Sequence, residues 1–155
     1  MKIRVVRGSG VAPTKMASYD AALADANVHN YNLIHVSSVI PADATVEFID
    51  TAPDLGSIGD ELTVVEARAT SAAQPVSAAL AWAASEEGPG LFYEAAGEES
   101  TERTRDRVEA GLEAGRKIRN WSFLDHEVVT ARAKPDGGFG TAVVLAVYGE
   151  GRPIR

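Results

Sequence analysis

The residues with the clearest chemical potential lie in one apolar segment, residues 32–41 (NLIHVSSVIP). Two neighbouring hydroxyl groups, on Ser37 and Ser38, close this run just before Pro41, at positions where apolar side chains are cheaper to bury. The pair is therefore a candidate for chemistry that needs hydroxyl groups. Alone it is a weak signal, because two hydroxyls that hydrogen-bond to the backbone at a strand end would give the same pattern.

Other common kinds of site find little support. The three histidines, His29, His35 and His126, have no metal-ligand spacing, so we expect no metal site. The glycine-rich residues 7–10 (RGSG) lack the lysine of a phosphate-binding loop and predict a plain turn. No Gly-x-Ser-x-Gly elbow occurs. The chain has no cysteine, which excludes disulfides, thiolate catalysis and cysteine metal sites.

Composition bounds the class of protein. The chain has 155 residues and is 45% hydrophobic, so we expect a single domain, 1–155, with one core. A net charge of −7 argues against nucleic acid as a partner, because such proteins usually carry a basic patch. The first residues do not resemble a signal peptide, and no apolar run has the roughly 18 to 20 residues that span a membrane. We expect a soluble, cytoplasmic protein that acts on a small molecule.

The spacing of apolar residues predicts about seven strands and two helices. One helix is expected over residues 16–28, with Asn27 as its stop, and a clearer one over residues 101–120, with Ser100 as its N-cap. Residues 75–85 are rich in alanine, but their position between two strand-like runs favours a strand. Apart from residues 75–85, the seven expected strands are residues 2–7, 31–40, 46–49, 62–69, 91–95, 123–133 and 139–148.

The C-terminal strands carry the strongest information on the fold. Residues 123–133 and 139–148 flank a Pro-Asp-Gly-Gly segment, which predicts a β-hairpin. Residues 141–147 have no polar face, so this strand is expected to be buried on both sides. Helices that cover both outer faces of packed sheets would bury it, and an α+β sandwich is the natural fold class.

Four segments, taken in order, resemble the pyruvoyl-dependent arginine decarboxylases. No single segment is diagnostic, but the ordered set is specific, and the resemblance extends from about Gly8 to Tyr148. It implies a layered αββα fold and a homotrimer of processed subunits, with active sites between neighbouring subunits. The four segments are residues 18–26 (SYDAALADA), 32–41 (NLIHVSSVIP), 90–94 (GLFYE) and the end of a charged helix at 119–121 (RNW).

The resemblance implies that the chain is a proenzyme that cuts itself. Ser38 Oγ would attack the carbonyl carbon of Ser37, and elimination would leave a pyruvoyl group at residue 38, with a β chain of residues 1–37 and an α chain of residues 38–155. The reaction needs a strained, fixed scissile bond and donors for the developing oxyanion. The pyruvoyl carbonyl would form a Schiff base with the substrate amine, so we expect neither pyridoxal phosphate nor a metal.

The resemblance also implies roles for three polar residues. Asn32 would donate to the oxyanion or a carbonyl near the cut, although an asparagine there could equally be a turn or cap residue. Glu94 would protonate the α-carbon after carbon dioxide leaves, although it could be an exposed strand-end glutamate. Asp20 would accept two hydrogen bonds from the guanidinium of arginine, although a helical aspartate is usually a solvated charge.

Two other functions stay open at this point. The chain could be a pyruvoyl decarboxylase for another amino acid, such as histidine or aspartate, although Asp20 would repel an aspartate side chain. It could also be a non-cleaving trimeric binding protein of the same fold, which would need neither the serine pair nor Glu94. His29, in place of the family's usual glycine, and Ala95 and Ala96 after Glu94 depart from the pattern and bear on the shape of the substrate pocket.

Overall fold

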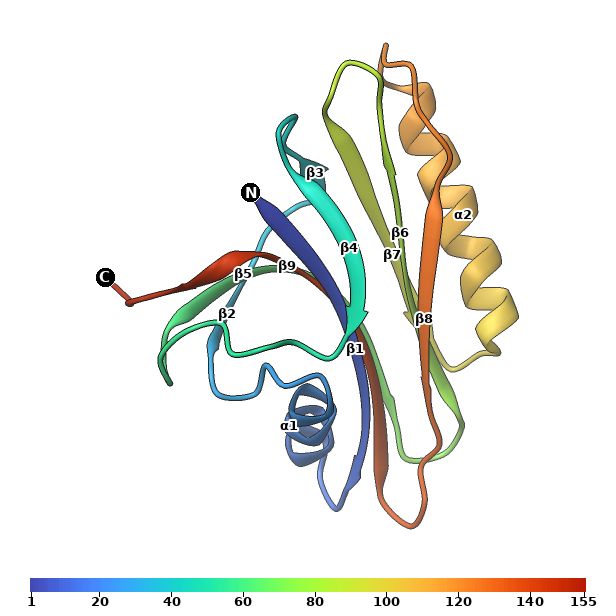
Figure 1. The fold of residues 1–155 in the computed structure, drawn as a ribbon. Helices are drawn as coiled ribbons and strands as arrows, with labels where there is room; N and C mark the ends of the chain where they lie inside the picture. Colours follow the sequence, from blue (N-terminus) through green and yellow to red (C-terminus); the bar gives the residue numbers. More distant parts are fainter.

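Two β-sheets lie face to face, and a helix covers the outer face of each (Figure 1). The structure, a computed structural model, describes residues 1–155. The five-stranded sheet has the order β2 (Asn32–His35), β5 (Glu61–Ser71), β9 (Phe139–Arg152), β1 (Lys2–Ala12), β4 (Thr45–Asp50). The four-stranded sheet has the order β3 (Val39–Ile40), β7 (Gly90–Gly97), β6 (Val76–Ala84), β8 (Glu127–Ala133). Helix α1 (Lys15–Asp25) packs on the five-stranded sheet and α2 (Thr101–Lys117) on the four-stranded sheet.

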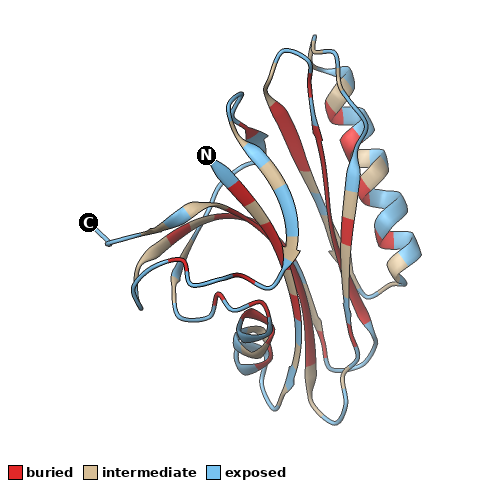
Figure 2. Ribbon diagram, viewed as in Figure 1, coloured by how far each residue is buried: buried red, intermediate tan, exposed pale blue.

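Strand β9 shows how the layers are held together. Every residue from Thr141 to Val147 is fully buried, because successive side chains point to opposite faces of the sheet. Val144 and Ala146 pack between the sheets, whereas Val143 and Leu145 pack beneath α1. Figure 2 shows the buried residues concentrated along the strands and on the sheet-facing side of both helices. The predicted two-sided burial and the predicted αββα sandwich are both confirmed.

Helix α1 lies unusually close to β1. The side chain of Thr14 caps the helix by accepting from the amide of Ala17 at 3.1 Å. A Cβ atom at Gly8 would collide with the carbonyl group of Ala22, and one at Gly10 would lie 2.6 Å from the Cβ of Ala21. The prediction of a turn at residues 7–10 is therefore wrong. These glycines lie inside β1 and leave room for the helix backbone.

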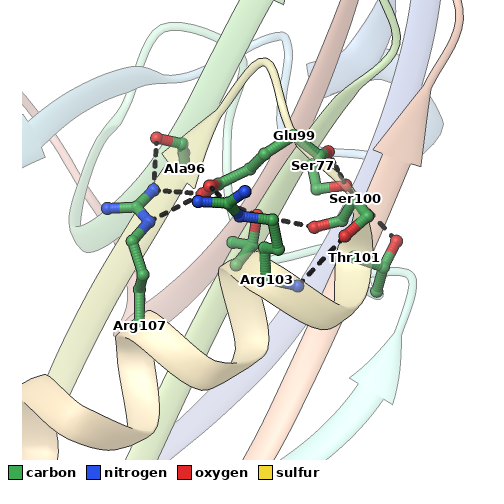
Figure 3. Close-up of polar contacts among 8 residues, drawn as sticks. Ser77, Ala96, Glu99, Ser100, Thr101, Arg103 and Arg107 are labelled. Carbon is green, nitrogen blue, oxygen red and sulfur yellow. Dashed lines mark hydrogen bonds and ion pairs between the residues drawn. The ribbon is translucent and has the colours of Figure 1, made fainter.

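Helix α2 begins at a polar cluster that ties it to the end of β7. Ser100 caps the helix as predicted, accepting from the amide of Arg103 at 3.2 Å. Glu99 accepts from Arg107 Nε at 2.7 Å, and Arg107 also donates to the carbonyl oxygen of Ala96 at 3.1 Å (Figure 3). The hydrogen bond from Arg107 lowers the pKa of Glu99, so this carboxyl stays ionised. The helix ends at Lys117, slightly before the predicted end.

Two connections between strands differ from the prediction. Residues 31–40 were expected to form one strand, but they form β2 and β3, which belong to different sheets. Likewise β8 and β9 do not form a hairpin, because β8 pairs with β6 and β9 pairs with β1 and β5. In both places the chain crosses from one sheet to the other. Residues 75–85, which were ambiguous, do form a strand, β6.

Candidate active site

The serine pair lies where the chain crosses between the two sheets. On one side of the crossing, the amide of Val36 donates to the carbonyl oxygen of Val64 in the five-stranded sheet at 2.9 Å. On the other side, the carbonyl oxygen of Ser38 accepts from the amide of Phe92 in the four-stranded sheet at 2.8 Å. The bond between Ser37 and Ser38 is thus anchored to a different sheet at each end. Ser37 is exposed and Ser38 is half-buried.

The anchoring continues beyond the pair. Tyr148 OH donates to the carbonyl oxygen of Val39 at 2.9 Å. Burial raises the pKa of Tyr148 to about 12, so the phenol remains a neutral donor across the physiological range. The only non-glycine residues with positive φ are Asn27 and Asp50, so the crossing is fixed by hydrogen bonds and not by a left-handed backbone.

Glu94 lies close to Ser38 along β7. In the antiparallel pairing of β3 with β7, Val39 stands opposite Leu91, so Ser38 is level with Phe92. The carbonyl oxygen of Ser38 accepts a hydrogen bond from the amide of Phe92. Glu94 is two residues further along the same strand, about 7 Å away, and on the same face as Phe92. The structure therefore brings the predicted Ser38 and Glu94 to one edge of the sandwich.

A groove of about 460 Å³ opens at this edge, and we call it the edge groove. It exists because both edge strands are short: β2 stops where His35 pairs with Val64, and β3 pairs only with Gly90 and Leu91. The residues of β5 and β7 that follow these pairs therefore have no neighbouring strand on that edge of the sheet. The groove is lined by His35, by Glu66, Ala67 and Arg68 of β5, and by Glu94, Ala95 and Ala96 of β7.

The surroundings of Glu94 favour its protonated form. Desolvation by the walls of the groove is the largest cause that raises the pKa of Glu94, and the charge of Glu66 is the second. A smaller effect of His35 acts in the opposite direction. The side chain still reaches the surface at one side, so it is accessible to a substrate. A carboxyl group that is accessible and has a raised pKa suits a general acid.

Glu66 is a site residue that the sequence reasoning missed. Only 4% of its side chain is exposed, yet it is a carboxylate. Its Oε2 accepts from Tyr19 OH at 2.7 Å, and its Oε1 lies 3.0 Å from His35 Nε2. Burial, followed by the bond to Glu66, raises the pKa of Tyr19. The available signal was the alternation in β5, which puts Glu66 on the same face as the buried Leu62 and Val64.

Asp20 and Asn32 lie in a second groove, of about 670 Å³, between α1 and β2, which we call the helix groove. Asp20 is exposed on α1. Asn32 Nδ2 donates to the carbonyl oxygen of Gly59 at 2.9 Å, so its amide is already engaged. Asn32 stands at the start of β2, and the rise of three residues along the strand from Asn32 to His35 already spans about 10 Å. Within one chain, the structure therefore does not bring Asn32 to the serine pair.

The two grooves meet at a shared wall. His35 and Arg68 line both of them. The guanidinium of Arg68 lies over the ring of Tyr19, 4.4 Å from its centroid, which is a cation–π geometry. Arg68 and Tyr19 thus separate the two acidic side chains: Asp20 lies on the side of the helix groove and Glu94 on the side of the edge groove.

No cluster of three or more histidine, aspartate and glutamate side chains is arranged to hold a metal ion. Neither helix combines the length and apolar character needed to cross a membrane.

Comparison with known proteins gives one consistent result. A family model described as pyruvoyl-dependent arginine decarboxylase matches residues 2–153. A protein of that name from Halobacterium salinarum is 57% identical over 155 residues, which cover 99% of this chain and 97% of the relative. Proteins of the same name from Pyrococcus horikoshii (39% identical over 143 residues, 87% and 88% covered) and Methanopyrus kandleri (32% over 146 residues, 94% of each) also match. The chain belongs to the pyruvoyl-dependent arginine decarboxylase family.

Proposed function

We propose that this protein converts L-arginine to agmatine and carbon dioxide, with a pyruvoyl group that it makes from its own Ser38. Membership of the family supports the reaction. The observation in the structure that carries the proposal is the register that places Ser38 level with Phe92, two residues from Glu94 on β7, with the peptide bond before Ser38 anchored on both sides. When formed, the pyruvoyl carbonyl supplies an electron sink for the carbanion that loss of carbon dioxide leaves.

The first step that we propose is cleavage between Ser37 and Ser38. Ser38 Oγ attacks the Ser37 carbonyl carbon, and the peptide bond becomes an ester. β-Elimination then breaks the bond between Cβ and Oγ of residue 38 and releases Ser37 as a carboxylate. The resulting dehydroalanine takes up water and loses ammonia, which leaves the pyruvoyl group. The products are residues 1–37 and residues 38–155.

The position of Ser38 fits a pyruvoyl group. The reaction changes the amine and the hydroxyl of residue 38 but keeps its carbonyl group. The amide of Phe92 can therefore hold that carbonyl oxygen before and after the cut. A prosthetic group that is already hydrogen-bonded to a rigid strand needs no further ordering when substrate binds.

Glu94 is the proton donor in this proposal. The α-carbon must receive a proton after carbon dioxide leaves, and the donor must be a protonated acid near the reacting carbon. Glu94 is accessible from the edge groove, and desolvation together with Glu66 raises its pKa. Both properties support the role.

Asp20 is the guanidinium acceptor in this proposal. It is exposed on α1 and lines the helix groove, where a carboxylate can accept two parallel hydrogen bonds from a planar guanidinium. Asn32 lines the same groove. We assign to Asn32 the donation of a hydrogen bond near the cut, in a partner subunit, because its own serine pair lies beyond the far end of β2.

We infer that the working assembly is a homotrimer with shared sites. In one chain, Asp20 and Asn32 line the helix groove and Glu94 lines the edge groove, so a neighbouring copy is needed to complete a site. Exposed apolar side chains around the crossing support a covered surface there: Ile34, Val36 and Val39 are 43%, 39% and 48% exposed. Aliphatic residues that are clustered and exposed in a single chain are typical of an interface.

The experiment that tests the proposal combines a mass measurement with an assay. The purified protein is denatured, with and without prior borohydride reduction, and its intact mass is measured. The expected result is two chains that break between Ser37 and Ser38, with the larger one gaining the mass of carbonyl reduction, and formation of agmatine from arginine. A single uncut chain without activity would favour a binding protein. A cut chain that decarboxylates histidine and not arginine would favour the other pyruvoyl enzyme.

A further inference from the structure

Glu66 is the most deeply buried acidic side chain beside the proposed site, and the reaction as described makes no use of it. Both of its oxygens have partners, because Tyr19 OH donates to Oε2 at 2.7 Å and His35 Nε2 lies 3.0 Å from Oε1. A buried carboxylate is costly unless its oxygens are hydrogen-bonded, so this one is held in a single place. Glu66 also lines the edge groove with Glu94, so the two side chains border the same space.

We propose that Glu66 is a positioning residue for the decarboxylation: its buried carboxylate, fixed by Tyr19 and His35 beside the edge groove, acts on Glu94, the acid that donates to the α-carbon. The proposal rests on the proposed function and deepens it, because it states why Glu94 can serve as an acid. Glu66 touches neither the serine pair nor the proposed guanidinium acceptor. Its effect passes through Glu94.

The charged groups around Glu94 come from three elements. Strand β5 contributes Glu66 and Arg68, β2 contributes His35, and α1 contributes Tyr19 through its bond to Glu66. Of these, Glu66 raises the pKa of Glu94 and His35 lowers it. The two neighbours of Glu94 in the groove wall, Ala95 and Ala96, carry no charge. Glu66 therefore acts on Glu94 as a like charge, which disfavours ionisation of Glu94.

The direction of the pH dependence follows from this sign. Glu94 must be protonated to donate, so kcat falls as the pH rises through its pKa. A raised pKa keeps the enzyme active to higher pH. Removing the charge of Glu66 should therefore move this fall in kcat, the falling limb of the pH profile, to lower pH. Removing His35 should move it to higher pH, because His35 lowers the pKa of Glu94.

The test compares pH profiles of kcat for arginine in the wild type, Glu66→Gln, Glu66→Asp and His35→Gln, normalised to the cut fraction measured by mass. We expect the limb of Glu66→Gln at lower pH and that of Glu66→Asp near the wild type, because aspartate keeps the charge. If Glu66 had only a structural role, Glu66→Asp should perturb the enzyme more than Glu66→Gln, because glutamine preserves the shape of the side chain and can still accept from Tyr19. Glu47→Gln removes one charge from β4, at the opposite edge of the sheet, and should leave the limb in place.

The outcomes separate this inference from the proposed function. An uncut or inactive wild type would defeat the proposed function itself. An active wild type whose limb does not move in Glu66→Gln would overturn the role of Glu66 alone. If Glu66→Gln does not fold, the pH profile of His35→Gln is the test, since the side chain of His35 is 53% exposed and tolerates change. A limb at higher pH in that variant supports the electrostatic arrangement, and an unmoved limb, or one at lower pH, contradicts it.

Discussion

The amide of Phe92 donates to the carbonyl oxygen of Ser38 at 2.8 Å, and this hydrogen bond extends the pairing of β3 with β7 to the serine pair. It agrees with the register of β3 on β7 and places Ser38 two residues from the level of Glu94. The nucleophile proposed for self-cleavage and the acid proposed for decarboxylation thus depend on the same strand. Their separation is fixed by the rise of β7 and not by a flexible loop.

Replacing Ser38 with alanine should abolish both cleavage and decarboxylation, because no hydroxyl remains to attack and no pyruvoyl group can form. Intact mass under denaturing conditions should show one chain of 155 residues. The matched control is Ser37→Ala, which should still cut, since Ser37 contributes only its backbone carbonyl group. Full activity in the Ser38→Ala protein would disprove the mechanism.

Replacing Glu94 with glutamine should leave cleavage largely intact and lower kcat by about 100-fold, the usual contribution of a general acid. The assay is agmatine formation by protein that mass measurement shows to be cut. Glu98→Gln, an exposed glutamate four residues further along the chain, serves as the control and should keep the wild-type rate. An unchanged kcat in Glu94→Gln would remove this residue from the chemistry.

Replacing Asp20 with asparagine should raise the KM for arginine by about tenfold or more, because a charge-assisted pair with the guanidinium is lost. Steady-state kinetics of the cut enzyme measure it. Asp106→Asn makes the same change at an exposed position of α2 and should have no effect. If KM is the same in both variants, Asp20 does not bind the substrate.

Replacing Gly115 with alanine should destabilise the protein, although alanine is the better helix former. A Cβ at Gly115 would overlap the Tyr93 ring and lie 2.5 Å from its hydroxyl oxygen. Overpacking typically costs about 1–3 kcal/mol, which outweighs the roughly 1 kcal/mol gained in helix propensity. Urea unfolding should report a lower free energy of unfolding.

Gly111 supplies the comparison for this prediction. A Cβ there would lie 3.0 Å from Cδ2 of the same tyrosine, so Gly111→Ala should cost less than Gly115→Ala. In a Tyr93→Ala background, the change at Gly115 should instead stabilise the helix. A stability of Gly115→Ala equal to or above the wild type would show that the ring moves aside at no cost.

Local patterns predicted the elements that depend on local physics. The cap at Ser100 and the two-sided burial of residues 141–147 follow from side chains and their immediate neighbours, and both are confirmed. The turn expected at residues 7–10 is wrong for a tertiary reason. Glycine there serves the close approach of α1, and a propensity rule cannot distinguish this use from a turn.

Long-range partners could not be predicted from the sequence. Residues 31–40 have continuous strand propensity, but nothing in them states that the first half pairs with β5 and the second half with β7. The serine pair stood out from its apolar surroundings, but the roles of Ser38 and Glu94 were assigned only because the chain resembles a family. Glu66 lies in no segment that carried the resemblance, and its importance depends on Tyr19 and His35, which are distant in sequence.

The position of β1 between β9 and β4 has a consequence for the matured protein. Residues 1–37 contain β1, which pairs with β9 over ten residues and also with β4. The smaller product of the proposed cut therefore contributes a strand that lies between two strands of the larger product. Before the cut, refolding is a unimolecular process. After the cut, it requires two separate polypeptides to meet, so its yield depends on their concentration. A denatured mature enzyme should therefore recover poorly on dilution, while the uncut precursor refolds independently of dilution.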